Sequence, residues 1–79
     1  MSTNKIKTGI YRHYKNQQHY RVLGTAIHSE TYEEMVIYQA LYDCGEFGIN
    51  SVWVRPLALF TEIVSGEQGE QPRFAYVSE

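Results

Sequence analysis

Hydrophobic and polar residues alternate most clearly over residues 19–28, which predicts a β-strand. One side of this strand carries Tyr20, Val22, Gly24, Ala26 and His28. The other side carries Arg21, Leu23, Thr25 and Ile27. Because neither side is wholly polar, we expect a central strand that is partly covered on both faces. Gly24 inside the strand predicts a β-bulge or a sharp bend.

The rest of the first half of the chain predicts an arm and two more strands. Residues 1–7 are polar and predict a loose arm. Residues 9–14 are rich in β-favouring side chains, and residues 15–18 form a polar break of hairpin length. After a polar turn, residues 35–42 are again rich in β-formers. An amphipathic helix over residues 31–42 is the alternative for that segment.

Glycine and proline divide the second half of the chain. Residues 43–50 form a loop with two glycines, which supply the positive backbone angles of tight turns. Residues 51–55 predict a short strand, which Pro56 ends because proline has no amide donor. A single helical turn with this proline at its first position follows. We then expect a strand, a flexible loop and a last strand, over residues 61–64, 65–72 and 73–77.

This order of elements predicts one domain over residues 1–79, with its core over about residues 8–64. We expect a mainly β fold, a small SH3-like barrel of five or six short strands with one or two short helical turns. Closing the sheet removes exposed edges, which a small open sheet protects poorly. A chain of this length buries only about 60% of its unfolded surface, so the core is modest.

The net charge is −2, but the charges are unevenly distributed. Residues 1–28 hold five of the seven Lys and Arg and no acid, and residues 29–79 hold all nine acids. Two interpretations are open: the charges neutralise one another across neighbouring strands, or the first part forms a basic binding face. A domain that binds nucleic acid strongly usually has an overall basic balance, which this chain lacks.

The sequence also predicts the cellular compartment of the protein. Its single cysteine, Cys44, cannot form a disulfide within the chain, which is typical of a reducing compartment. The longest apolar run, residues 57–60, is far below the roughly 18 residues that span a bilayer. The first residues lack the apolar stretch of a signal peptide. We expect a cytoplasmic protein with no membrane partner, and the sequence leaves the oligomeric state open.

Signals for a metal, a cofactor or catalysis are weak. Histidines at positions 13, 19 and 28 and the one cysteine lack the closely spaced ligand pair of a zinc site. No glycine pattern for phosphate binding is present, so we expect neither a metal nor a cofactor. A small hydrolase would use His28, Ser29 and Glu30 as base, nucleophile and orienting acid. The other interpretation is a turn in which residues 29–31 bond their own backbone.

Seven tyrosines and one tryptophan are the strongest functional signal. Tyrosine combines a flat apolar body with a polar tip, which suits contact surfaces. The alternative is that these rings form the core and rim of the barrel. Trp53 and Arg55 share one side of their strand, as do Tyr38 and Tyr42. The candidate ligand-binding residues are Tyr11, His13, His28, Glu30, Tyr38, Trp53 and Arg55.

Four segments carry a resemblance to a known family: residues 9–15, 20–31, 36–42 and 53–57, completed by Phe60 and Glu62. In these segments the chain resembles the small bacterial domain-of-unknown-function family numbered 1653. The resemblance implies an SH3-like barrel and implies no activity. The chain departs from the family pattern in the loop 43–50, which is longer, and in the hairpin turn, which lacks a glycine after Lys15.

These observations favour a binding module over an enzyme. We expect it to recognise a protein or peptide through its aromatic, histidine and arginine surface. A small barrel that binds single-stranded RNA or DNA is the alternative, because residues 11–21 are basic and aromatic. Arg55 would bind an anionic or carbonyl group of the ligand. It would otherwise pair with Glu30 or Glu62 and close the barrel.

Overall fold

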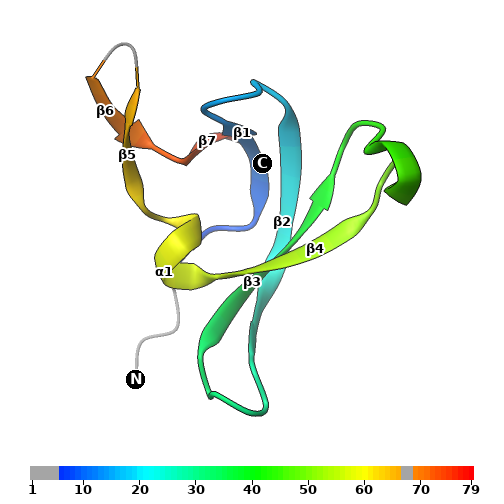
Figure 1. Ribbon diagram of the computed structural model, residues 1–79, viewed down its shortest axis with the longest axis vertical. Helices are drawn as coiled ribbons and strands as arrows, with labels where there is room; N and C mark the ends of the chain where they lie inside the picture. The colour runs from blue at the N-terminus through cyan, green and yellow to red at the C-terminus, as the bar shows by residue number, and fades with distance from the viewer. Residues whose placement is uncertain (1–5, 67–68) are drawn as a thin grey trace.

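The computed structural model describes residues 6–66 and 69–79 (Figure 1). These residues confirm the mainly β prediction, with seven strands, one turn of 3-10 helix and one turn of α-helix. In chain order the elements are β1 (Gly9–His13), β2 (His19–Ile27), β3 (Glu34–Ala40), η1 (Gly45–Phe47), β4 (Val52–Pro56), α1 (Leu57–Phe60), β5 (Ile63–Gly66), β6 (Gly69–Pro72) and β7 (Phe74–Ser78). None of the described helices is long and apolar enough to cross a membrane.

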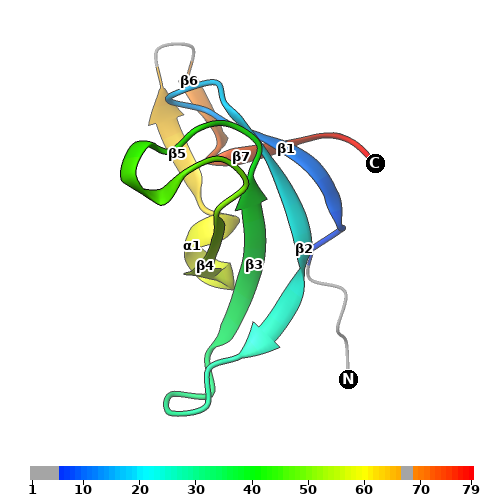
Figure 2. The same cartoon turned by 90° about the vertical axis from the view of Figure 1, so that its right-hand side faces the viewer.

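Five strands form one antiparallel sheet in the order β4-β3-β2-β1-β7, and β5 and β6 form a separate two-stranded ribbon. The sheet bends around α1, which lies against one face (Figure 2). Strands β4 and β7 are the two edges, and within the described residues they do not pair with each other. Strand pairing therefore gives an open sheet rather than the closed barrel that the sequence predicts.

The β2–β3 hairpin shows both a confirmed and a wrong expectation. The register shifts between Val22 and Gly24, so the predicted bulge is confirmed. Residues 34–40 form a strand, so the alternative helix over residues 31–42 is wrong. Strand β2 is central in the sheet, as expected, but the expectation that it is partly covered on both faces is wrong. Tyr20 and Val22 are buried on one face, while Arg21 and Leu23 on the other face are exposed.

The core lies on the inner face of the sheet, which we define as the face that α1 covers. Its buried members are Tyr11, Tyr20, Val22, Val36, Tyr38, Ala40, Phe60 and Phe74. The rings of Phe60 and Phe74 stack with centroids 4.0 Å apart and only 4° between their planes. Three of the seven tyrosines are therefore core residues, as the alternative interpretation of the aromatic set requires.

The helical turn α1 forms where the sequence predicts it, because Pro56 ends the ladder and Phe60 anchors the turn in the core. Pro56 occupies the N-cap position rather than the expected first helical position. At the other end, the Thr61 hydroxyl donates to the Leu57 carbonyl at 2.9 Å. The turn brings the chain from the edge strand β4 across the inner face.

The expected loop over residues 65–72 is wrong, since β5 and β6 pair from Ile63↔Pro72 to Gly66↔Gly69. The expectation for residues 67–68 lies outside the described residues, as does that for residues 1–5 of the arm. Ile6 packs against the core, and the Tyr11 hydroxyl donates to the Lys7 carbonyl at 2.8 Å. The described end of the arm is therefore bound to the sheet.

Candidate binding cleft

A cleft of about 200 Å³ lies on the inner face across the neighbouring strands β2, β3 and β4. It is lined by Tyr20, Tyr38, Tyr42, Cys44, Trp53 and Arg55. Pockets that hold a drug-sized ligand or cofactor typically measure about 300–1,000 Å³. The size of this cleft therefore suits one or two side chains of a partner.

Strand register explains why these side chains meet. Tyr38 is paired with Trp53, and Val36 with Arg55, across the β3–β4 ladder. Since side chains alternate along a strand, Trp53 and Arg55 fall on the inner face together with Tyr38. Tyr20 reaches the same place from β2, with its ring centroid 5.4 Å from that of Tyr38.

Hydrogen bonds fix the aromatic walls of the cleft. The hydroxyl oxygens of Tyr20 and Tyr42 lie 2.6 Å apart and share a hydrogen bond. Burial and this hydrogen bond raise the pKa of Tyr42, so its hydroxyl remains protonated at neutral pH. The indole Nε1 of Trp53 donates to the Ser51 hydroxyl at 2.8 Å. Phe47 from η1 meets the Trp53 ring edge-on, with centroids 5.1 Å apart.

The Arg55 guanidinium lies at one side of the cleft, over the ring of Phe74. No carboxylate of the described residues lies within ion-pair distance of it. Glu62 instead binds Arg73, with 2.7 Å between Oε1 and the guanidinium nitrogen. The expected alternative, in which Arg55 pairs with Glu30 or Glu62, is therefore not formed.

His13 borders the cleft from β1, beyond Phe74. Its ring meets Phe74 edge-on with centroids 4.8 Å apart, and its Nδ1 accepts a hydrogen bond from the Lys15 amide at 3.1 Å. Burial lowers the pKa of His13, and the positive charges of Arg55 and Arg73 lower it further. His13 is therefore neutral at pH 7 and adds no charge beside Arg55.

The chain is similar to proteins of one known family. The model of DUF1653, described as a protein of unknown function, matches residues 9–76. The chain belongs to the DUF1653 family. A crystal structure of a DUF1653 protein from Bordetella bronchiseptica is 40% identical in sequence and superposes with a TM-score of 0.83. The match covers 98% of this chain and 94% of that one. The comparison with curated proteins found no match.

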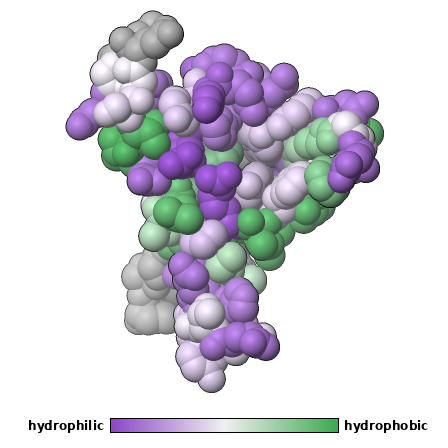
Figure 3. All heavy atoms as spheres, viewed as in Figure 1, coloured by the Kyte–Doolittle hydropathy of each residue, from purple (hydrophilic) through white to green (hydrophobic). Residues whose placement is uncertain are grey.

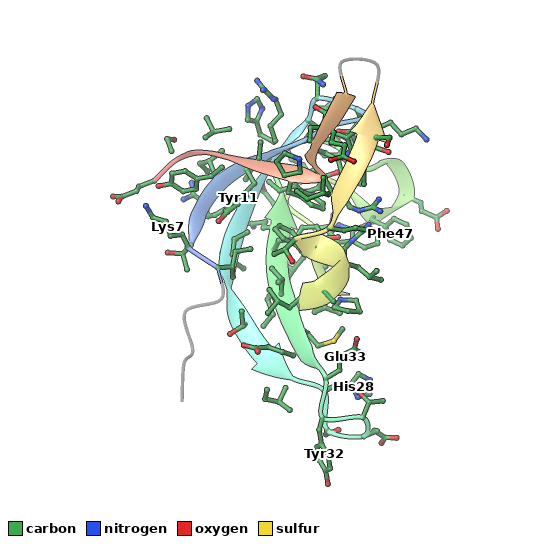
Figure 4. The ribbon with its side chains drawn as sticks, turned by 90° about the vertical axis from the view of Figure 1, so that its left-hand side faces the viewer. Lys7, Tyr11, His28, Tyr32, Glu33 and Phe47 are labelled. Carbon is green, nitrogen blue, oxygen red and sulfur yellow. The ribbon has the colours of Figure 1, made fainter. Side chains whose placement is uncertain are left out.

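Three of the candidate residues lie outside the cleft of this DUF1653 domain. Tyr11 is buried against Phe60, where both line a separate, open and mainly apolar pocket of about 450 Å³. His28 and Glu30 belong to the turn between β2 and β3, and Figure 4 shows His28 beside Glu33 in this turn, with Tyr32 at the far end of the molecule. The structure thus brings Tyr38, Trp53 and Arg55 together with His13 nearby, and leaves the other three apart.

The turn that contains His28 bonds its own backbone. The Nδ1 atom of His28 accepts hydrogen bonds from the backbone amides of Glu30 and Thr31, at 3.1 and 3.4 Å. In the described part of the chain, no hydrogen bond joins Ser29 to His28. This geometry matches the turn interpretation rather than the arrangement of a hydrolase.

Three residues that line the cleft, Tyr20, Tyr42 and Cys44, are not among the site residues predicted from the sequence. Tyr42 was recognisable, because it lies four residues after Tyr38 in the same extended segment. Tyr20 is brought to the cleft by the register of the β2–β3 hairpin. Phe74, which lies under Arg55, is brought there by the pairing of β1 with β7, two strands far apart in the sequence. Among the described residues, no cluster of three His, Cys, Asp or Glu side chains could hold a metal ion.

Proposed function

We propose that this domain is a binding module that recognises a protein or peptide through the cleft formed by Tyr20, Tyr38, Tyr42, Trp53 and Arg55. The half-buried Arg55 carries the proposal, since no described carboxylate pairs with its guanidinium. A guanidinium offers five donors in a planar fork, which matches a carboxylate or a pair of carbonyl oxygens. The complementary group is therefore supplied by the ligand.

The other walls of the cleft narrow the chemistry of that ligand. The lining has no acidic side chain, and the neighbouring His13 is neutral, so a cationic group would meet only the charge of Arg55. Trp53 and the tyrosine rings offer apolar faces with hydroxyl tips. The ligand that fits best presents an apolar or aromatic side chain together with a carboxylate or carbonyl oxygen.

Trp53 makes this proposal directly testable, because it is the only tryptophan in the chain and lines the cleft. We expect the Trp53 fluorescence to change, and the change to saturate, when the protein is titrated with short peptides that carry an aromatic residue and an acid. The matched peptides with the acid replaced by its amide should bind more weakly. Equal binding of both peptide sets would remove Arg55 from the proposed site.

Single-stranded RNA or DNA remains the second candidate ligand. Arg12 on β1 and Arg21 on β2 are exposed and form no ion pair within the described residues. The tyrosines of the same strands, Tyr11 and Tyr20, are buried on the inner face. Phosphate contacts and base stacking would thus use opposite faces, which favours a peptide. Binding to an oligonucleotide panel at low salt, weakening steeply as salt rises, would support this candidate instead.

The strongly bent sheet and the single helical turn after β4 support an SH3-like class for the fold. The free thiol of Cys44 supports work in a reducing compartment such as the cytoplasm.

A further inference from the structure

Strand β4 is an open edge of the five-stranded sheet. The Ala40 amide donates to the Ser51 carbonyl at 2.8 Å. In an antiparallel ladder alternate residues bond to the same neighbour, so Trp53 and Arg55 also direct their backbone groups toward β3. The amides and carbonyls of Val52 and Val54 therefore point away from the sheet. They offer a row of backbone groups to an added strand.

The side chains of this edge are apolar on its outer face. Val52 and Val54 are 57% and 59% exposed. In the space-filling view, hydrophobic residues gather along β4 and the η1 loop (Figure 3). Natural sheet edges are usually protected by charged side chains, above all lysine, or by proline within the strand. Here the only charge on β4 is Arg55, on the inner face, and Pro56 stands at the end of the strand.

We propose that an extended peptide segment of a partner protein adds antiparallel to β4 and places an acidic side chain over Arg55. This inference rests on the proposed function and names the way in which the peptide binds. Directly opposite residues in an antiparallel pair have Cβ atoms about 4.5–5.5 Å apart, so an acid opposite Arg55 is within ion-pair reach. Strand addition supplies backbone bonds, and the cleft supplies side-chain selectivity.

The register of β4 sets the order of side chains in the peptide. Reading the peptide from its N-terminus, an acid stands opposite Arg55 and an apolar residue opposite Val54. An aromatic residue then stands opposite Trp53, beside the cleft, and a second apolar residue opposite Val52. The expected motif is therefore acid, apolar, aromatic, apolar.

A second copy of the chain fits this edge less well. Two β4 strands related by a two-fold axis pair antiparallel. Registers centred on Val52, Trp53 or Val54 would place Ile49, Ser51 or Trp53 of the other copy opposite Arg55. None of these residues is an acid, so self-pairing leaves both guanidinium groups without a carboxylate. Charge complementarity thus favours a partner peptide.

The test uses the wild-type protein and the acetylated, amidated peptide Thr-Glu-Val-Tyr-Val-Thr. Trp53 fluorescence measures affinity, and amide hydrogen exchange measures strand addition. The Val52 and Val54 amides should become protected, and that of Trp53 should change little because it already bonds β3. Methylating the backbone nitrogen of the first valine removes a donor to β4 and should weaken binding about tenfold or more. Methylating the tyrosine nitrogen, which points away from β4, is the matched control and should leave the affinity nearly unchanged.

Protein variants separate this inference from the proposed function. Val54→Pro removes an outward backbone donor and should weaken peptide binding. Val54→Thr keeps this donor and nearly the same side-chain shape, and it is the matched control. If the peptide binds and needs Arg55, yet both methylated peptides bind equally, strand addition is wrong and the cleft proposal stands. If peptide protects the Val52 and Val54 amides from exchange, but the Arg55→Gln variant binds the peptide as tightly as wild type, the cleft proposal is wrong. Protection of these amides without peptide, with a dimer mass in solution, would assign the edge to a second copy. No binding at millimolar peptide would overturn strand addition.

Discussion

The guanidinium of Arg55 lies over the ring of Phe74, with 5.6 Å between the guanidinium carbon and the ring centroid. Cations within about 6 Å of an aromatic ring centre are attracted by the negative face of the ring. Phe74 also meets His13 edge-on from the side of β1. The ring thus holds Arg55 beside the cleft without neutralising its charge.

Arg55→Lys tests whether the fork of donors matters. Lysine keeps the charge and an ability to lie over Phe74 but loses the bidentate geometry. We expect peptide affinity measured by Trp53 fluorescence to fall about tenfold, or about 1.4 kcal/mol. The melting temperature should change little. Arg12→Lys, on the exposed outer face, is the control. A lower melting temperature with unchanged affinity would show a structural role instead.

The lowered pKa of His13 predicts a pH dependence of stability. Burial is its main cause, followed by the charges of Arg55 and Arg73. With the folded-state pKa below the unfolded value of about 6.5, the unfolded chain binds more protons in the interval between them. The free energy of unfolding should therefore fall as pH drops below about 6.5. Urea unfolding at several pH values should show this dependence in wild type.

His13→Gln should flatten this pH dependence, because glutamine does not titrate. His19→Gln, at an exposed position of β2, is the matched control substitution. Equal pH profiles for His13→Gln and wild type would contradict the assignment. An anionic peptide bound at Arg55 should also raise the pKa of His13, because it offsets the positive charge there. Titration of the His13 ring by NMR, with and without peptide, measures this shift.

Gly9 is expected to resist substitution. Its φ of +136° is one that side chains rarely adopt, and a Cβ there would lie 2.7 Å from the Ser78 carbonyl oxygen. Gly45 also has a positive φ, +69°, but a Cβ there would have open space. Gly45→Ala should lower the free energy of unfolding by about 1–2 kcal/mol. Gly9→Ala should lower it by about a further 1–3 kcal/mol, because the added Cβ overpacks the site. Equal losses in urea unfolding would show that β7 moves aside.

Phe60→Ala tests how far α1 supports the core. Phe60 is 1% exposed and stacks on Phe74, so its removal opens a cavity beside the cleft. The expected loss is about 3–5 kcal/mol, a large part of the stability of a domain this small. Leu59→Ala in the same turn removes a half-exposed side chain and should cost far less. Similar midpoints for the two variants in urea unfolding would contradict the role of Phe60.

The sequence by itself determined the features that depend on neighbouring residues. Gly24 marked the bulge in β2, and Pro56 marked the end of β4 and the helical turn after it. The two-residue period of a strand placed Trp53 and Arg55 on one face. Each of these follows from the conformational limits of one residue or from the geometry of one strand, so no knowledge of the rest of the fold was needed.

Only the tertiary structure decided which segments became neighbours. The polar segment after β5 gave no sign that β6 would pair with it, because a short ribbon needs only backbone bonds and not an apolar pattern. Tyr11 and Tyr20 became core residues, and Glu62 paired with Arg73 rather than Arg55. Such choices depend on register and burial across distant strands. The registers of the β2–β3 and β3–β4 hairpins brought Tyr20, Trp53 and Arg55 to one cleft and left His28 and Glu30 in a remote turn.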